Sequence, residues 1–130
     1  MLSPQTLDHF QNPRNSGQVA SPDSTVQLTN PACGDILKLT LKLSAGPASE
    51  ARIEDIRFLA QGCVPSIACA SALTELVRGQ TIPAARAFTR DQLIQAVGGL
   101  PRASTHAAQL ALDTLTAALA AALAKPAPPG

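Results

Sequence analysis

The chain of 130 residues contains no tryptophan and no tyrosine, and phenylalanine occurs only at Phe10, Phe58 and Phe88. It also lacks an excess of one charge, because ten basic and nine acidic side chains give a formal net charge of +1. A surface that binds nucleic acid needs clustered Lys and Arg side chains, or aromatic rings on which bases stack. We therefore expect no nucleic-acid partner.

The N-terminus has no basic region followed by an apolar block, which is the pattern of a secretory signal. The alanine-rich C-terminal stretch is the one long apolar segment, and Asp113 and several threonines interrupt it. We interpret this stretch as an amphipathic helix of a soluble domain. The expectation is therefore a cytoplasmic protein that does not bind a membrane.

The periodicity of apolar residues predicts three strands followed by helices, which is typical of an α+β domain. The clearest strand spans residues 36–43, where Leu37, Leu39, Leu41 and Leu43 share one face. The other expected strands span residues 26–30 and 52–60, and the expected helices span residues 4–11, 65–78, 91–97 and 104–125. One domain is expected over residues 1–125, with a disordered tail at 126–130.

Apolar stripes on two of these helices give the expected packing faces. In the first helix, Leu7 and Phe10 are three residues apart and fall on one face. In the last and longest helix, the leucines expected to pack inward are Leu112, Leu115, Leu119 and Leu123.

Potential metal ligands fall at three junctions between these elements. Cys33 and Asp35 precede the long strand, Cys63 lies between the last strand and a helix, and His106 begins the final helix. In an extended segment Cys33 and Asp35 would face the same side and could share one ion. Three cysteines in a cytoplasmic chain indicate a metal, a reactive thiol or burial rather than a disulfide framework.

Each candidate ligand also has a simpler interpretation. The Cys33-Gly34-Asp35 segment has the composition of a turn, Cys63 could be a small buried residue, and His106 could be a solvated first-turn side chain. Cys69 lies six residues after Cys63, about 9 Å further along a helix, so burial explains it better than a shared ion.

Four segments together resemble the iron-sulfur cluster scaffold proteins of the IscU/NifU N-terminal type. The match covers nearly the whole chain up to the tail, and the first two segments are the specific ones. In order, the segments are Leu7-Asp8-His9-Phe10-Gln11-Asn12-Pro13-Arg14-Asn15-Ser16-Gly17, Asn30-Pro31-Ala32-Cys33-Gly34-Asp35, Gln61-Gly62-Cys63, and Leu100-Pro101 leading to His106.

The resemblance implies a three-stranded antiparallel sheet with helices packed on it. It implies that Cys33, Asp35, Cys63 and His106 bind iron or a [2Fe-2S] cluster, which is handed on to recipient apoproteins. Sulfur would come from a cysteine desulfurase as persulfide, so the chain itself is not expected to be an enzyme. Such a donor set is also adequate for Zn²⁺ in the purified protein.

Two positions depart from the family. Ala107 stands where the family has a third cysteine that binds metal and accepts persulfide. Residues 100–104 differ from the Leu-Pro-Pro-Val-Lys segment that a dedicated heat-shock-type chaperone recognises, which makes that partner doubtful. The alternatives are therefore a zinc-binding or metal-free module that regulates a cysteine desulfurase, or a folded relic whose site is idle.

Overall fold

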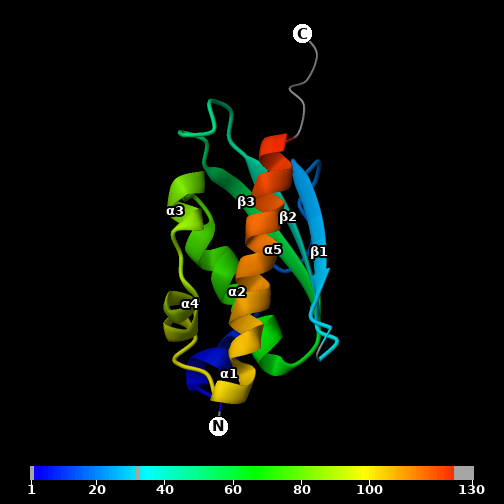
Figure 1. The fold of residues 1–130 in the computed structure, drawn as a ribbon, viewed down its shortest axis with the longest axis vertical. Helices are drawn as coiled ribbons and strands as arrows, with labels where there is room; N and C mark the ends of the chain where they lie inside the picture. Colours follow the sequence, from blue (N-terminus) through cyan, green and yellow to red (C-terminus); the bar gives the residue numbers. More distant parts are fainter. Residues whose placement is uncertain (1, 32, 125–130) are drawn as a thin grey trace.

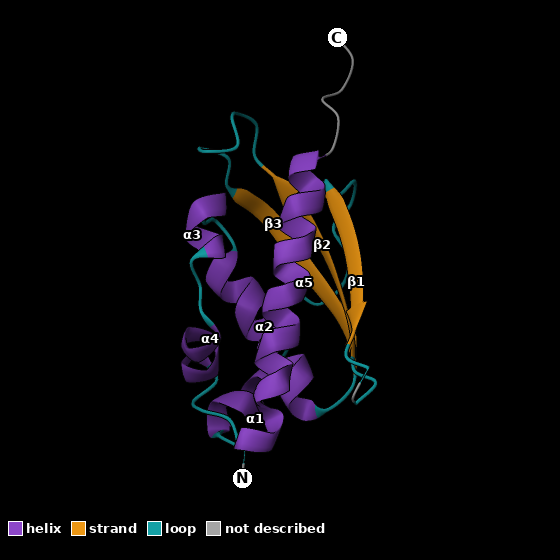
Figure 2. Cartoon of the chain, in the orientation of Figure 1, coloured by secondary structure: helices purple, strands orange, loops and turns teal. Residues whose placement is uncertain are grey.

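The computed structural model describes residues 2–31 and 33–124, and its architecture is the α+β fold expected from the sequence. Three strands form one antiparallel sheet in the order β1-β2-β3, and the helices lie on one side of it (Figures 1 and 2). The predicted tail at 126–130 lies outside the described residues. The elements are α1 (Pro4–Gln11), β1 (Ser24–Thr29), β2 (Ile36–Leu43), β3 (Ile53–Gln61), α2 (Val64–Val77), α3 (Ile82–Arg86), α4 (Arg90–Ala96), the 3₁₀-helix η1 (Arg102–Ser104) and α5 (Thr105–Ala124).

The central strand β2 carries the core face of the sheet. Leu37, Leu39 and Leu41 are at most 2% exposed, and they join side chains of β3, α2 and α5 in one hydrophobic core. Alternate side chains of a strand point to the same face, so the period-two pattern in the sequence predicted this face correctly. Leu43, at the end of the strand, is only half-buried.

Helix α5 runs lengthwise over the sheet and contacts β1, β2 and α2 (Figure 1). By length and composition the segment Arg102–Ala124 could cross a membrane, but half of its most apolar window is buried inside the fold, as in the core helix of a globular domain. Leu115 and Leu119 pack inward as predicted and Leu112 does so partly, but the prediction for Leu123 was wrong, because it is 38% exposed. The inner stripe continues through Ala118 and Ala122 instead, in keeping with 3.6 residues per turn.

Helix α1 packs through its polar residues. Its predicted bounds are confirmed, but Leu7 and Phe10 are 41% and 38% exposed, whereas Thr6 and His9 are buried. The Thr6 hydroxyl donates to the carbonyl oxygen of Val97 at 3.0 Å. His9 Nδ1 lies 2.8 Å from Ser71 Oγ on α2. Specific hydrogen bonds therefore orient this helix where an apolar stripe does not.

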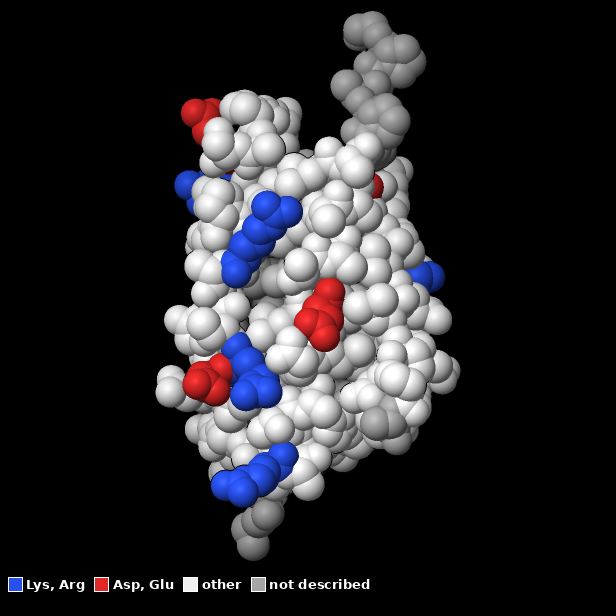
Figure 3. Space-filling model, viewed as in Figure 1, with Lys and Arg blue, Asp and Glu red and all other residues white. Residues whose placement is uncertain are grey.

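The short helix α3 was not predicted, because five residues are too few to show a helical period. Its local signal is Thr81, whose hydroxyl accepts a hydrogen bond from the backbone N–H of Ala84 and so caps the first turn. On the face shown in Figure 3, Lys and Arg side chains are few and scattered, and one of them lies beside an acidic side chain. This face has no extended basic patch of the kind that binds nucleic acid.

Candidate metal centre

Cys33 and Asp35 lie in the loop that joins β1 to β2. Thr29 and Ile36 pair at the ends of these strands. The loop is closed by hydrogen bonds from Asn30 N to the Asp35 carbonyl oxygen, at 2.8 Å, and from Gly34 N to the Asn30 carbonyl oxygen, at 2.7 Å. Gly34 adopts a φ of +76°, a conformation that favours glycine. A tight loop, rather than the extended segment expected from the sequence, therefore brings the thiol and the carboxylate together.

The carboxylate of Asp35 is buried at the start of α2, with only 4% of the residue exposed. Its Oδ1 accepts a hydrogen bond from the backbone N–H of Cys63 at 3.2 Å. Its Oδ2 accepts from the Ser66 hydroxyl, and Cys63 Sγ lies 3.4 Å from the same oxygen. Burial raises the pKa of the Asp35 carboxyl, but hydrogen bonds from Ser66, Cys33 and Cys63 outweigh burial and hold the pKa below its usual value.

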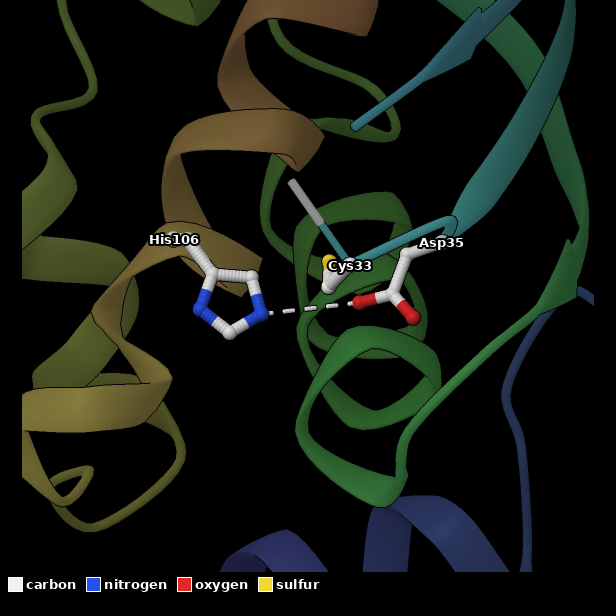
Figure 4. A group of neighbouring side chains, drawn as sticks. All are labelled: Cys33, Asp35 and His106. Atoms are coloured by element: carbon white, nitrogen blue, oxygen red, sulfur yellow. Dashed lines mark ion pairs between the residues drawn. The ribbon is translucent and has the colours of Figure 1, made fainter. Parts of the chain in front are cut away.

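His106 approaches Asp35 from the first turn of α5, and the two side chains point toward one another (Figure 4). Its Nδ1 lies 3.0 Å from the carbonyl oxygen of Ala103, and because a carbonyl only accepts, Nδ1 is the donor. Its Nε2 is buried, makes no hydrogen bond within the described part of the chain, and lies 3.5 Å from Asp35 Oδ2. In an imidazole with its proton on Nδ1, this Nε2 carries a lone pair that is available to a metal ion.

The ligand atoms of Cys33, Asp35 and His106 all lie within 4.8 Å of one another. Donor atoms around one tetrahedral zinc ion are roughly 3.2–3.8 Å apart, so small side-chain movements bring the three onto one ion. Cys63 is outside this group of three, but its Sγ lies 3.4 Å from Asp35 Oδ2. The buried lone pair of His106 and the two nearby thiols suit a soft or borderline metal ion.

Cys33 is exposed, and its acidity depends on Asp35. A hydrogen bond from the backbone of Asp35 lowers the pKa of the Cys33 thiol. Three other effects raise the pKa of this thiol, namely desolvation, the Asp35 carboxylate and Cys63. Together they outweigh the backbone hydrogen bond, so the pKa lies above its usual value. A bound cation reverses this balance, because a thiol that coordinates a metal is deprotonated.

All four ligands predicted from the sequence therefore lie at one end of the fold, and their role as ligands stays a prediction. The burial alternative for Cys63 was wrong, because its side chain is exposed. Cys69 is fully buried as predicted, and burial raises the pKa of its thiol to about 12. Ala107, next to His106, is 1% exposed and belongs to the core.

Sequence reasoning missed two residues that shape this site. Gly62 has a φ of +153°, and a Cβ added there would lie 2.2 Å from Asp35 Oδ1. Ser66 is 6% exposed and contacts both Asp35 and Cys63. The spacing of three between Cys63 and Ser66 was a usable signal, because residues at i and i+3 share one face of a helix.

A groove of about 500 Å³ opens beside His106. Its lining includes Asn30 from the β1–β2 loop, Arg90 from α4, and Gln109 and Asp113 from α5. The groove therefore adjoins the candidate centre at His106, and the exposed Cys33 and Cys63 give the centre access to the surface.

Comparison with known proteins gives consistent matches over most of the chain. Residues 1–127 match the family described as the NifU-like N terminal domain. The iron-sulfur cluster assembly scaffold protein IscU 1 of Archaeoglobus fulgidus is 41% identical over 119 residues, which cover 92% of this chain and 74% of that relative. The scaffold protein IscU of Escherichia coli K12 is 36% identical over 121 residues, which cover 91% of both chains.

The fold also matches a solved structure. The N-terminal part of a NifU-like protein from Brucella abortus superposes with a TM-score of 0.75 and covers 95% of each chain. The two sequences are 19% identical, so this likeness concerns the fold alone.

Proposed function

The chain belongs to the family of NifU-like N-terminal domains, and we propose from this that it is a scaffold or carrier for iron-sulfur cluster assembly. In this proposal iron and sulfide are its substrates. It holds them as iron or as a [2Fe-2S] cluster and passes them to recipient apoproteins. Its relatives in Archaeoglobus fulgidus and Escherichia coli are named as scaffold proteins, which supports a role that is not enzymatic.

The observation that carries the proposal is the convergence of unlike donor atoms around the buried Nε2 of His106. The thiol of Cys33 and the carboxylate of Asp35 lie within 4.8 Å of it. The N–H at Nδ1 is engaged by the backbone carbonyl of Ala103, which is the usual way in which a protein orients a metal-binding histidine. With Cys63, the set offers two thiolates, one imidazole and one carboxylate.

This mixed set suits a cluster that must leave again. Iron-sulfur clusters are usually held by cysteine thiolates, with histidine tolerated. Replacing thiolate by harder nitrogen and oxygen donors makes a cluster more labile, which helps transfer.

The proposal also includes a cysteine desulfurase as sulfur donor and a cytoplasmic location. Because Ala107 provides no third thiol, persulfide sulfur would have to be accepted at Cys33 or Cys63.

The test is anaerobic reconstitution of the whole chain with ferrous iron, cysteine, a cysteine desulfurase and excess dithiothreitol, which reduces the persulfide sulfur to sulfide. We expect visible charge-transfer absorption together with bound iron and acid-labile sulfide. Cys33→Ala and Cys63→Ala should each lose most of this absorption. Cys69→Ala is the matched control, because it removes a thiol that is buried in the core, and it should retain the absorption.

Absence of the absorption in the wild-type chain would contradict the proposal. Absorption in the Cys33→Ala and Cys63→Ala variants equal to that of the wild type would also contradict it.

Ala107 favours a second candidate, a zinc-binding or metal-free module that regulates a cysteine desulfurase. In that case protein purified without oxygen contains about one zinc ion per chain, or no metal, and no sulfide. Efficient uptake of persulfide by the wild-type chain would exclude this second function.

A further inference from the structure

Ser66 lies directly behind the candidate ligands, in the first turn of α2. Its hydroxyl donates to Asp35 Oδ2, and its Oγ also lies 3.2 Å from Cys63 Sγ. The residue is 6% exposed, so water does not readily replace these contacts. The backbone of this turn is fixed as well, because Ser66 N donates to the Cys63 carbonyl oxygen at 3.1 Å.

Asp35 Oδ2 is the point at which these groups meet. Ser66 Oγ, Cys63 Sγ and His106 Nε2 all approach this one oxygen. When Cys63 and His106 bind a metal, the thiol loses its proton and the imidazole directs its lone pair at the ion. Neither group then donates a hydrogen bond to Asp35. The Ser66 hydroxyl does not depend on the metal for its proton, so it remains a side-chain donor to the buried carboxylate.

We propose that Ser66 is a positioning residue for the metal centre, which holds the carboxylate of Asp35 toward Cys33 and His106. This inference rests on the proposed function, because it needs Asp35 to be a ligand. Outer-shell hydrogen bonds of this kind fix the orientation of a ligand, and their loss typically weakens metal binding by roughly 10- to 100-fold. The Ser66→Ala variant should therefore keep both thiols but bind metal more weakly and with altered geometry.

The experiment uses Co²⁺ as a spectroscopic probe of the whole chain under anaerobic conditions. Titration of the Ser66→Ala variant should give a dissociation constant roughly 10- to 100-fold above that of the wild type. Its visible d–d bands should shift in position and intensity because the carboxylate is no longer held in place. The thiolate-to-cobalt charge-transfer band should remain, since Cys33 and Cys63 are unchanged.

Ser71→Ala is the matched control. Ser71 is also a buried serine on α2, but its hydroxyl accepts from Arg14 N and contacts His9, away from the ligands. This variant should lower the melting temperature of the metal-free protein while leaving the Co²⁺ affinity and spectrum as in the wild type. Ser66→Thr keeps a hydroxyl at position 66 and should retain most of the affinity, which provides a second variant if Ser66→Ala folds poorly.

The outcomes separate this inference from the proposed function. If wild type binds Co²⁺ and Ser66→Ala binds it equally well with the same spectrum, the role of Ser66 is overturned and the metal site stands. Equal weakening in Ser66→Ala and Ser71→Ala would also overturn it, because the effect would then be one of folding. If the wild-type chain binds no Co²⁺, the proposed metal site fails and the inference fails with it.

Discussion

At the scale of single residues, the burial of the Asp35 carboxylate depends on the absence of a side chain at Gly62. The position of a Cβ at residue 62 lies 2.2 Å from Asp35 Oδ1 and 2.7 Å from its carboxyl carbon. Such separations are far inside van der Waals contact, so the carboxylate and a methyl group cannot share this space. Gly62 and Ser66 therefore act on the same ligand from two sides, one by leaving room and one by donating a hydrogen bond.

We expect Gly62→Ala to displace Asp35 and to weaken zinc binding by more than about tenfold. The measurement is the free energy of unfolding with and without zinc, because a ligand at 100 times its dissociation constant adds about 2.7 kcal/mol. Gly46→Ala is the control, since Gly46 also has a positive φ, +122°, but nothing lies within 4 Å of its added Cβ. Both variants lose stability from backbone strain, but only Gly62→Ala should lose about half or more of the zinc-dependent increment. An undiminished increment in Gly62→Ala would contradict this prediction.

At the scale of elements, helix α1 docks on α2 through a buried histidine. His9 is 7% exposed, and its Nδ1 lies 2.8 Å from Ser71 Oγ. Desolvation lowers the pKa of His9 below its usual value of 6.5, and the nearby Arg14 lowers it further. The neutral imidazole is therefore the form that the folded chain prefers, whereas the unfolded chain binds a proton more readily.

This preference gives the stability of the fold a pH dependence with a defined sign. As the pH falls below about 6.5, the unfolded state takes up a proton that the native state does not, so the free energy of unfolding decreases. The slope is at most about 1.4 kcal/mol per pH unit, and it ends below the lowered pKa. Urea unfolding of the metal-free protein between pH 7.5 and 5.5 measures it. His9→Gln should flatten this slope, and an unchanged slope in that variant would assign the effect to other groups.

The strands and long helices were predictable because each repeats a pattern over many residues. The alternation of Leu37, Leu39 and Leu41 predicted both β2 and its buried face. Periodicity could not predict the outward orientation of Leu7 and Phe10. That orientation depends on hydrogen bonds that hold the opposite face of α1 inward, and Thr6 and His9 make these bonds with residues far away in the sequence, Val97 and Ser71. For the same reason the contact of Ser66 with Asp35, 31 residues apart, could not be seen in the sequence.

At the scale of the whole molecule, the candidate centre exists because three junctions meet at one end of the fold. The β1–β2 loop, the start of α2 and the start of α5 supply Asp35, Cys63 and His106, and Figure 1 shows these segments near the same end. The sequence predicted that the ligands fall at junctions. The sequence pattern did not show that these junctions lie next to one another. The expectation that they do came from the family resemblance. The meeting of these loops follows from the antiparallel sheet and from the course of α2 and α5 along it.

This arrangement divides the three thiols of the molecule into two classes, which alkylation can separate. Cys33 and Cys63 are exposed at the centre, whereas Cys69 is 0% exposed in the core and has a pKa of about 12. Iodoacetamide reacts with accessible thiolates, so intact mass spectrometry of the metal-free native protein should show two added labels. The third should appear only in denaturant. Zinc should slow the first two reactions because coordinated thiolates are shielded.

Cys69→Ala serves as the control for this assignment. It should show the same two labels at the same rates in the native state, and no third label in denaturant. Rapid labelling of Cys69 in the native wild type would contradict its burial in the hydrophobic core. If zinc binds but protects neither Cys33 nor Cys63 from alkylation, the metal lies elsewhere. An ion that is coordinated by these two sulfurs cannot leave both of them free to react.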